Sequence, residues 1–428
     1  MLDIKFIREN PDKVKENIKK KFQDSKVALV DDIIAKDKEY LLLLKETEIL
    51  RNKRNTISKD INDAKKNGVD PSDILEEAKK IPEKLKTIEL KLSALSNEIN
   101  DILLSIPNII HDSVPIGKND SENVVREIIG DPVVPNFEVI NHAEIAESLH
   151  VADFDTSAET SGNGFYYLKG DLALLNVALI NYSRDYMVKN GYEYVEPPLM
   201  IRENVLKGVY SASEIEQMSY KIDGEDLFLI ATSEHPLIGM FIGKTLSKDI
   251  LPLKLTSFSS CFRKEIGSHG IDEKGLYRTH QFNKQEMVVI CEPEDSYKFY
   301  DEMLNHSKEL FRGLGIPIRE RECCSGDLGD LKAKSADLEA WSPRKKDYFE
   351  ITSCTNMEEA QARRLQIKIT DGKKKYFAHT LNNTAIATSR AMVAILENFQ
   401  DKNGNILIPK ALQPYMYGKT KIGSIRWK

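Results

Sequence analysis

The sequence contains no long apolar run and few cysteines. Nowhere do the roughly 18 consecutive apolar residues of a membrane-spanning helix occur, and the N-terminus is charged from residue 3, unlike a secretory signal. The five cysteines are an odd number in a chain of 428 residues, which fits reduced thiols better than a disulfide framework. We therefore expect a soluble, intracellular protein.

Two common site signatures are also missing. The cysteines form no CxxC pair and have no histidine at ligand spacing, so we expect no zinc site at Cys323, Cys324 and Cys354. The segment GMFIGKT, residues 239–245, looks like a phosphate-binding loop, but its glycines enclose three residues where that loop needs four. The apolar residues around it have helical spacing, which predicts a helix face instead. No GxGxxG sequence stands between a predicted strand and helix.

The charge balance is slightly acidic, with a formal net charge of −6. This balance argues against a surface coated with nucleic acid but permits local basic patches. The apolar content of 41% over 428 residues is enough for at least one large core, and the length suggests two or three domains.

A heptad pattern dominates the N-terminal part of the chain. Seam positions recur at alternating three- and four-residue steps, stop at the breaker 67–71 and resume beyond it. Two such arms joined by a short turn predict an antiparallel coiled-coil hairpin, because the other arm is the nearest partner for each seam. Pro82 predicts a kink or a frayed first turn in the second arm. The seam positions are Tyr40, Leu43, Thr47, Leu50, Arg54, Ile57, Ile61 and Ala64, then Ile74, Ala78, Ile81, Leu85, Ile88, Leu92, Leu95, Ile99, Ile102 and Ile106.

The exposed faces of this hairpin are basic. Such charge is usually a solvated face, but a projecting basic arm also suits a phosphate backbone, which it would bind by releasing counterions. The basic residues are Arg51, Lys53, Lys59, Lys65, Lys66, Lys79, Lys80, Lys84 and Lys86. After Pro107 the chain is rich in Pro, Gly, Asn and Asp, which is typical of a linker.

The remainder, from about residue 135, predicts an α+β domain. Its β-rich runs are not each followed by a helix, so an antiparallel or mixed sheet flanked by helices is favoured over a doubly wound parallel sheet. The runs cover residues 194–199, 227–231, 255–262, 279–291 and 347–353. The predicted organisation is an N-terminal domain at 1–106, a linker at 107–134 and a larger domain at 135–428.

Charged and aromatic residues gather on these β-rich runs. Two runs flank a loop, 266–277, that is longer than a hairpin needs, and extra length of this kind is usually functional or disordered. The arginines there could clamp a polyphosphate, a carboxylate with a hydroxyl could bind magnesium, and Phe282 could stack on a base. The alternative is an exposed hairpin tip with solvated charges. The residues are Arg263, Glu265, Arg278, Phe282, Glu286, Glu350, Ser353, Asn382, Thr384 and Arg390.

Several segments together resemble the seryl-tRNA synthetases of class II. GYEYVEPPLM (191–200), FRKE to RTHQF (262–282) and NNTAIATSRAMVAILENF (382–399) look like the three class II motifs. ATSEHPL (231–237) resembles their TxE element. The resemblance extends along nearly the whole chain, through MLDIKFIREN, PNIIHDSVPIG, FYYLKGDLALL, DLEAWSP and IPKALQPYM. It implies the hairpin-bearing form, whose catalytic domain is built on an antiparallel sheet, rather than the zinc-containing form.

By motif position, the resemblance implies an ATP site. Arg263 would bind the α-phosphate, Glu265 would recognise the adenine region and Phe282 would stack on the ring. Arg278 and Arg390 would hold the outer phosphates, with Mg²⁺ on Glu350 and Ser353. The implied catalytic residues are Arg263, Glu350 and Arg390, and the implied ATP-binding residues are Arg263, Lys264, Glu265, Arg278, Thr279, Phe282, Glu350, Ile351, Thr352, Ser353 and Arg390.

The resemblance also implies a serine pocket, a tRNA surface and a homodimer. Serine would be bound by Thr232, Ser233, Glu234, Arg263, Glu286, Asn382 and Thr384. The hairpin would grip the long variable arm of tRNA(Ser), and of tRNA(Sec) where present, and the motif 2 loop would contact the acceptor end. The implied tRNA contacts are Arg51, Lys53, Arg54, Lys79, Lys80, Ser268, His269 and Lys274. A cytoplasmic location and a dimer formed through motif 1 complete these expectations.

The chain departs from the family pattern in three places. Asn163-Gly164-Phe165 stands where most relatives have an arginine before the phenylalanine, His269 replaces a frequent aromatic residue, and NNT replaces NGS at 382–384. None of these changes removes a group that catalysis needs. Two alternatives stay open: a ligase that charges a carrier protein, and a non-catalytic tRNA-binding paralogue. The hairpin speaks against the first, and the intact Arg263, Glu286, Glu350 and Arg390 speak against the second.

Overall fold

The computed structural model describes residues 1–68, 70, 72–265 and 275–423 and divides the chain into two compact units, Met1–Pro107 and Asn108–Lys428. Within these residues, no helix is both long and apolar enough to cross a membrane.

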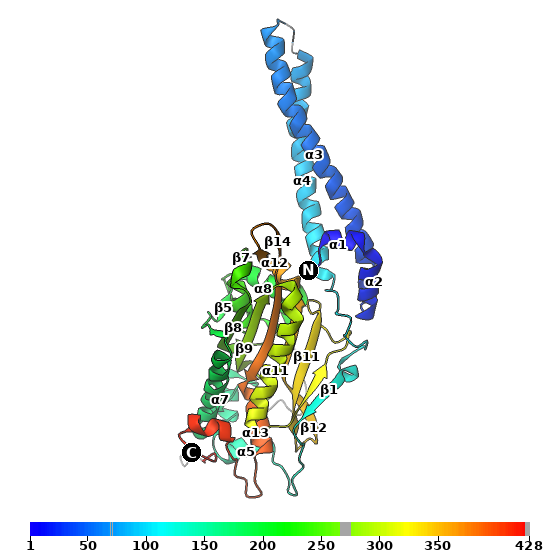
Figure 1. The fold of residues 1–428 in the computed structure, drawn as a ribbon. Coiled ribbons are helices and arrows are strands. Elements are labelled where there is room, and N and C mark those ends of the chain that lie inside the picture. Colours follow the sequence, from blue (N-terminus) through cyan, green and yellow to red (C-terminus); the bar gives the residue numbers. More distant parts are fainter. Residues whose placement is uncertain (69, 71, 266–274, 424–428) are drawn as a thin grey trace. The chain divides into compact units, whose positions relative to one another are not determined.

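The N-terminal unit is built around two long helices. Helices α3 (Ala28–Lys66) and α4 (Ser72–Ser105) lie side by side (Figure 1). Their seams meet in a buried cluster of Ile57, Ile81 and Leu85. The ion pairs Lys36–Glu98, at 2.5 Å, and Arg51–Glu89, at 3.0 Å, run in opposite order along the two helices. The predicted antiparallel hairpin is therefore confirmed.

Two details of the hairpin differ from expectation. Arg54 occupies a predicted seam position but is exposed, because its charge is better solvated than buried. Helix α4 continues through Pro82 and begins ten residues before it, so the frayed first turn is wrong, while the kink given as its alternative stays a prediction. Two short helices, α1 (Ile4–Glu9) and α2 (Pro11–Lys20), pack against α3, and Arg8 of α1 pairs with Asp37 at 2.7 Å.

The C-terminal unit contains an eight-stranded sheet in the order β1-β10-β11-β12-β15-β9-β8-β4. All neighbours pair antiparallel except β4 and β8, so the predicted antiparallel-dominated sheet is confirmed. The strands are β1 (Val124–Ile129), β4 (Glu193–Tyr194), β8 (Leu253–Phe262), β9 (Gln281–Cys291), β10 (Ile318–Glu322), β11 (Lys334–Ser342), β12 (Asp347–Glu358) and β15 (His379–Ala387).

Strand β9 shows how the two faces of this sheet differ. Because successive side chains of a strand point to opposite faces, Met287 and Val289 enter one apolar core while Val288 and Ile290 enter another. The first core is covered by α5 (His142–Ser148), α7 (Gly170–Lys189), α11 (Ser296–Leu314) and α13 (Thr388–Asn398). The second is covered by α8 (Glu203–Val209), α10 (Glu234–Gly239) and α12 (Ala360–Leu365).

Smaller elements complete the unit. They are the helices α6 (Asp155–Ser161) and α9 (Ala212–Met218) and the short strands β2 (Ala152–Asp153), β3 (Tyr167–Leu168), β5 (Met200–Ile201), β6 (Phe228–Leu229), β7 (Thr245–Ser247), β13 (Lys368–Thr370) and β14 (Lys375–Phe377). All five cysteines are buried thiols.

The segment predicted as a linker has a structural role. Its residues Val124–Ile129 form the edge strand β1, which pairs with β10. The buried Asn108 donates from its side chain to the carbonyl oxygens of Leu331, at 3.1 Å, and Met357, at 3.0 Å. Pro, Gly and Asn mark where regular structure stops, but they do not indicate whether the chain there is packed.

The helix predicted around GMFIGKT is wrong in its second half. Helix α10 ends at Gly239. Gly243 has a φ of +72°, in the left-handed region, so a right-handed helix cannot pass through it. Thr245–Ser247 then form β7, which pairs in parallel with β13. The pairing with a distant strand overrides the local helical spacing.

Candidate active site

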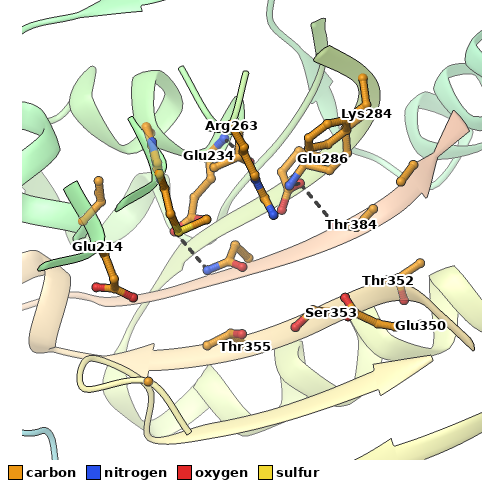
Figure 2. Close-up of a pocket in the computed structure, with 18 of the residues that line it drawn as sticks. Glu214, Glu234, Arg263, Lys284, Glu286, Glu350, Thr352, Ser353, Thr355 and Thr384 are labelled. Carbon is orange, nitrogen blue, oxygen red and sulfur yellow. Dashed lines mark hydrogen bonds and ion pairs between the residues drawn. The ribbon is translucent and has the colours of Figure 1, made fainter. Parts of the chain in front are cut away.

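A cavity of about 310 Å³ lies on the face of the sheet that carries α8 and α10. Figure 2 shows its floor, where Glu350, Ser353 and Thr355 follow one strand and Thr384 lies on the next. Glu286 lies beside Thr384 on the following strand, and Arg263 and Glu234 lie on the far side of Thr384 from Glu350. Side chains far apart in the chain therefore meet in one pocket.

Alternate side chains of strand β9 form one wall of the cavity. Phe282, Lys284 and Glu286 are two residues apart, so all three point to the cavity. Arg263 follows the end of β8, and its guanidinium lies over the Phe282 ring, 5.1 Å from the centroid. An arginine and an aromatic ring in this arrangement can bind an anionic group beside a planar one.

A bulge in β12 brings Glu350 and Ser353 to the same face. Residues three apart on a regular strand point to opposite faces. Here Glu339 pairs with Glu350 and Leu338 with Thr352, so one extra residue, Ile351, shifts the alternation. Both Glu350 and Ser353 then line the cavity, as a carboxylate and a hydroxyl that could bind a hard cation.

Arg390 sits in the first turn of α13 and pairs with Glu350. Its Nη1 is 2.9 Å from Glu350 Oε1 and donates to the Glu350 carbonyl oxygen at 3.2 Å. Burial works to raise the pKa of Glu350, but the Arg390 charge and hydrogen bond outweigh it and hold that pKa below its usual value. The Arg390 guanidinium also lies 5.1 Å from the centroid of the Tyr277 ring. Glu350 is therefore an anion at neutral pH.

The outer part of the cavity carries a third arginine, Arg278. Arg278 Nη1 lies 3.5 Å from Glu265 Oε2, and the Arg278 side chain is 50% exposed. Because exposed pairs of this kind contribute little to stability, Arg278 can exchange its partner for a ligand anion at small cost.

The inner part holds a buried polar triad. Lys284 and Glu286, both buried, form a close ion pair, and Thr384 Oγ1 donates to Glu286 Oε2 at 3.5 Å. Thr384 and Glu286 face each other across the β15–β9 ladder, which sets this contact. A carboxylate and a hydroxyl held in a dry pocket can recognise a small hydroxylated ligand.

Glu234, the first residue of α10, is buried beside this triad. Asn382 Nδ2 donates to Glu234 Oε1 at 3.0 Å, and Gln361 Nε2 donates to the same oxygen at 2.7 Å. Burial, reinforced by the nearby Glu286, raises the pKa of Glu234 to about 7. This carboxyl is poised between its neutral and charged forms near neutral pH.

The structure brings most of the predicted site residues together. Fifteen of them line the cavity: Thr232, Glu234, Arg263, Glu265, Arg278, Thr279, Phe282, Glu286, Glu350, Ile351, Thr352, Ser353, Asn382, Thr384 and Arg390. Ser233 and Lys264 are not among the described lining residues. Ser233 is fully buried and donates to the Ser257 carbonyl oxygen, while Lys264 donates to that of Glu216. Both have structural contacts in place of a cavity position.

The predicted tRNA contacts fall into two groups. Ser268, His269 and Lys274 lie outside the described residues. Arg51, Lys53, Arg54, Lys79 and Lys80 lie on the hairpin and are exposed. Arg51 pairs with Glu89, and Lys80 lies 3.6 Å from Glu76, so part of the basic charge is locally compensated.

Sequence reasoning missed several lining residues, among them Tyr210, Glu214, His235, Lys284 and Lys332. For Glu214 a signal existed: Ser211-x-x-Glu214 is a capping box, which marks the start of α9. Lys284 could have been found from its alternation with Phe282 and Glu286. Nothing local pointed to His235, which is neutral because burial lowers its pKa to about 3, or to Lys332, which lies on a loop.

Comparisons with known proteins agree with this geometry. Residues 1–110 match the family model of the seryl-tRNA synthetase N-terminal domain. Residues 217–399 match that of the tRNA synthetase class II core domain (G, H, P, S and T). The serine-tRNA ligase of Methanocella arvoryzae is 46% identical over 421 residues, which cover 98% of this chain and 99% of that protein. That of Thermococcus sibiricus is 40% identical over 437 residues, covering 97% and 96%.

Two solved structures are similar over nearly their whole length. The seryl-tRNA synthetase from Pyrococcus horikoshii, crystallised with ATP, has a TM-score of 0.95 and 39% identity, and each chain is fully covered. The cytoplasmic serine-tRNA ligase from Naegleria fowleri, in complex with AMP, has a TM-score of 0.88 and 34% identity over 99% of each chain. Fold, cavity and sequence together assign this chain to the seryl-tRNA synthetase family of class II aminoacyl-tRNA synthetases.

Proposed function

We propose that this chain activates L-serine with ATP, forming seryl-adenylate and pyrophosphate, and transfers the seryl group to the 3′ end of tRNA(Ser). The observation that carries the proposal is a single cavity with cations and an aromatic ring at one end and the buried Glu286–Thr384 pair at the other. This arrangement suits a nucleotide and a small hydroxylated amino acid side by side. Charging of tRNA(Sec) and a cytoplasmic location stay predictions.

ATP would occupy the end of the cavity with the three arginines. Arg263 would bind the α-phosphate together with the serine carboxylate, while Phe282 beside it would stack on the adenine. Arg278 and Arg390 would hold the outer phosphates. Arg390 is well suited to this task because Glu350 already fixes its guanidinium in place. Thr352, whose buried hydroxyl has no hydrogen-bond partner among the described residues, would add a polar contact.

Serine would occupy the inner end. Its hydroxyl would lie between Glu286 and Thr384, and its ammonium group would bind Glu234 and Thr232. Alanine has no hydroxyl, so it would leave the buried Glu286 and Thr384 without a hydrogen-bond partner. We therefore expect the pocket to bind alanine much more weakly than serine. Threonine has the same hydroxyl, so only the limited volume of the pocket can exclude it.

The first chemical step needs positioning and charge neutralisation. The serine carboxylate attacks the α-phosphorus in line, forming the new P–O bond as the bond to the β-phosphate oxygen breaks and pyrophosphate leaves. Arg263 holds both the attacking carboxylate and the α-phosphate, which reduces the entropy that the step must lose. In the second step the terminal ribose hydroxyl of tRNA attacks the adenylate carbonyl and AMP leaves.

A magnesium ion fits the pair Glu350 and Ser353. The two side chains offer hard oxygen atoms on one face of β12, and Mg²⁺ commonly takes few protein ligands and completes its shell with phosphate and water. The described residues contain no group of three or more His, Cys, Asp or Glu able to hold a metal by themselves. Bound there, the ion would neutralise phosphate charge.

ATP–pyrophosphate exchange followed by tRNA charging tests the proposal. Exchange that requires serine, together with charging of a tRNA(Ser) transcript, is the expected result. Exchange without charging would indicate a ligase that serves a carrier protein. The absence of both activities in folded protein would indicate a non-catalytic tRNA-binding paralogue and would overturn the proposal.

We further propose a homodimer formed through motif 1. Val188, Tyr194, Leu199 and Met200 are apolar and exposed in or near this motif, with Val188 50% exposed. Several exposed apolar side chains within one short segment are typical of an interface. Sedimentation at micromolar concentration is expected to give a dimer.

The variant Val188→Glu is expected to weaken this dimer at least about tenfold, because a charge buried in the interface is costly. Ile128→Glu, at an exposed isoleucine on β1, which forms the opposite edge of the sheet from β4, is the matched control and should leave the dimer intact. A fully active monomer, or equal behaviour of the two variants, would contradict this prediction.

A further inference from the structure

Only one of the two carboxylate oxygens of Glu234 accepts hydrogen bonds from the residues that the structure describes. Its Oε1 accepts both protein hydrogen bonds, from Asn382 Nδ2 and from Gln361 Nε2, while Oε2 accepts none from any residue that the structure describes. Glu234 lines the cavity, so the uncommitted oxygen belongs to a ligand-facing group. The two donors thus divide the carboxylate into a fixed oxygen and an available one.

Gln361 reaches Glu234 from outside the cavity. It lies on α12, is 1% exposed and is not one of the described cavity-lining residues. It therefore acts on a ligand only through Glu234. Of the two donors it makes the shorter bond, at 2.7 Å against 3.0 Å for Asn382.

Thr380 and the Glu234 carboxylate together fix the orientation of the Gln361 amide. Thr380 Oγ1, fully buried on β15, donates to Gln361 Oε1 at 2.8 Å. With its oxygen engaged there, the amide presents its NH₂ group to the carboxylate. A flipped amide would set an oxygen against the Glu234 oxygen, which is unfavourable in a buried site.

We propose that Gln361 and Thr380 are positioning residues that hold Glu234 Oε1, so that Oε2 is presented to the ammonium group of the amino-acid substrate. The proposal rests on the proposed function, because it takes Glu234 to be the receptor of that ammonium group. Nothing in the signature motifs points to this relay, which connects β15, α12 and α10 through buried side chains.

The charges around Glu234 make this support necessary. Burial is the main cause that raises its pKa to about 7, and Glu286 on β9 raises it further. The Gln361 hydrogen bond lowers it, as do Lys284 on β9 and Lys332 on the loop before β11. Tyr210, at the end of α8, also faces Glu234 but is neutral, since burial raises its own pKa. Without the Gln361 donor, less Glu234 is ionised at pH 7.

The expected pH dependence follows directly. Glu234 must be ionised to receive an ammonium group, so serine binding strengthens as pH rises through its pKa. Loss of the Gln361 donor raises that pKa, and the midpoint of the profile moves to higher pH. A variant of this kind should therefore be impaired most at low pH and recover partly as pH rises.

Gln361→Met tests the relay with a side chain of similar length. Loss of a hydrogen bond to a charged group is expected to raise the KM for serine about 10- to 100-fold at pH 7 in pyrophosphate exchange. The KM for ATP should change less than about threefold, and the pH profile of kcat/KM for serine should shift upward. An unchanged serine KM and pH profile would overturn the proposal.

Thr380→Val and Thr380→Ser form the matched pair. Valine keeps the shape and removes the hydroxyl, whereas serine keeps the hydroxyl. We expect Thr380→Val to repeat the Gln361→Met effects and Thr380→Ser to behave as wild type. Equal behaviour of the two would refute the relay even if Gln361→Met failed to fold. Wild-type protein without serine-dependent exchange would instead refute the proposed function.

Discussion

Replacing Arg263 with alanine is expected to lower serine-dependent pyrophosphate exchange by at least about a hundredfold, ~2.7 kcal/mol of transition-state stabilisation. In the proposed complex this guanidinium holds the attacking carboxylate and the α-phosphate together, so its loss removes both positioning and charge neutralisation. We expect little loss of stability, because the Arg263 side chain is only partly buried and, among the described residues, its hydrogen bond to the Ala231 carbonyl oxygen is long, at 3.4 Å.

Two controls sharpen this experiment. Arg312→Ala removes an exposed arginine on α11 that pairs with Glu309 in the same helix, and it should leave exchange unchanged. Arg263→Lys keeps the charge but loses the forked geometry, so it should recover only part of the activity. Activity of Arg263→Ala within about tenfold of wild type, with an intact circular dichroism spectrum, would contradict the assigned role.

Shortening the hairpin is expected to spare serine activation and to raise the KM for tRNA steeply. The proposed partner is the long variable arm of tRNA(Ser). A paired RNA arm presents a deep, narrow major groove, so we expect recognition of backbone shape and charge rather than of bases. Thr47 on α3 and Leu92 on α4 both lie between the Lys36–Glu98 and Arg51–Glu89 ion pairs, so they stand at similar heights along the hairpin and can be joined by a short turn.

Deletion of residues 48–91, with a short Gly-Ser turn joining Thr47 to Leu92, therefore keeps the base of the hairpin. It preserves the Arg8–Asp37 pair, which a deletion from Asp37 would break. Pyrophosphate exchange should remain within about twofold of wild type, while the KM for tRNA(Ser) rises at least about a hundredfold. Unchanged tRNA affinity would show that the hairpin is only a structural spacer.

Charge substitutions on the hairpin provide a second test of tRNA binding. Lys79→Gln with Lys80→Gln should reduce the slope of log affinity against log salt concentration, because fewer counterions are released on binding. Lys5→Gln with Lys20→Gln, at exposed lysines on α1 and α2, removes equal charge away from the arm and is the control. An equal effect of both pairs would indicate a general rather than a local electrostatic attraction.

Local spacing predicted the elements whose partners are close in sequence. The heptad steps from Tyr40 to Ile106 predicted the hairpin, because both seams lie in one short stretch of chain. The same kind of reasoning failed at Gly243 and Thr245, where pairing with β13 replaces the expected helix. It also treated the segment after Pro107 as a linker, although Val124–Ile129 pair with β10. In both cases a distant strand decides the conformation.

By itself, the sequence determined the residue types of the site and the alternation that aligns Phe282, Lys284 and Glu286, because side-chain period along a strand is a local property. Only the tertiary structure decided that Glu350 and Ser353 share a face, since that depends on a bulge against β11. Only it showed that Gln361 supports Glu234, from 127 positions away. Such contacts depend on how separate elements pack, and no local pattern records which buried donor will meet which carboxylate.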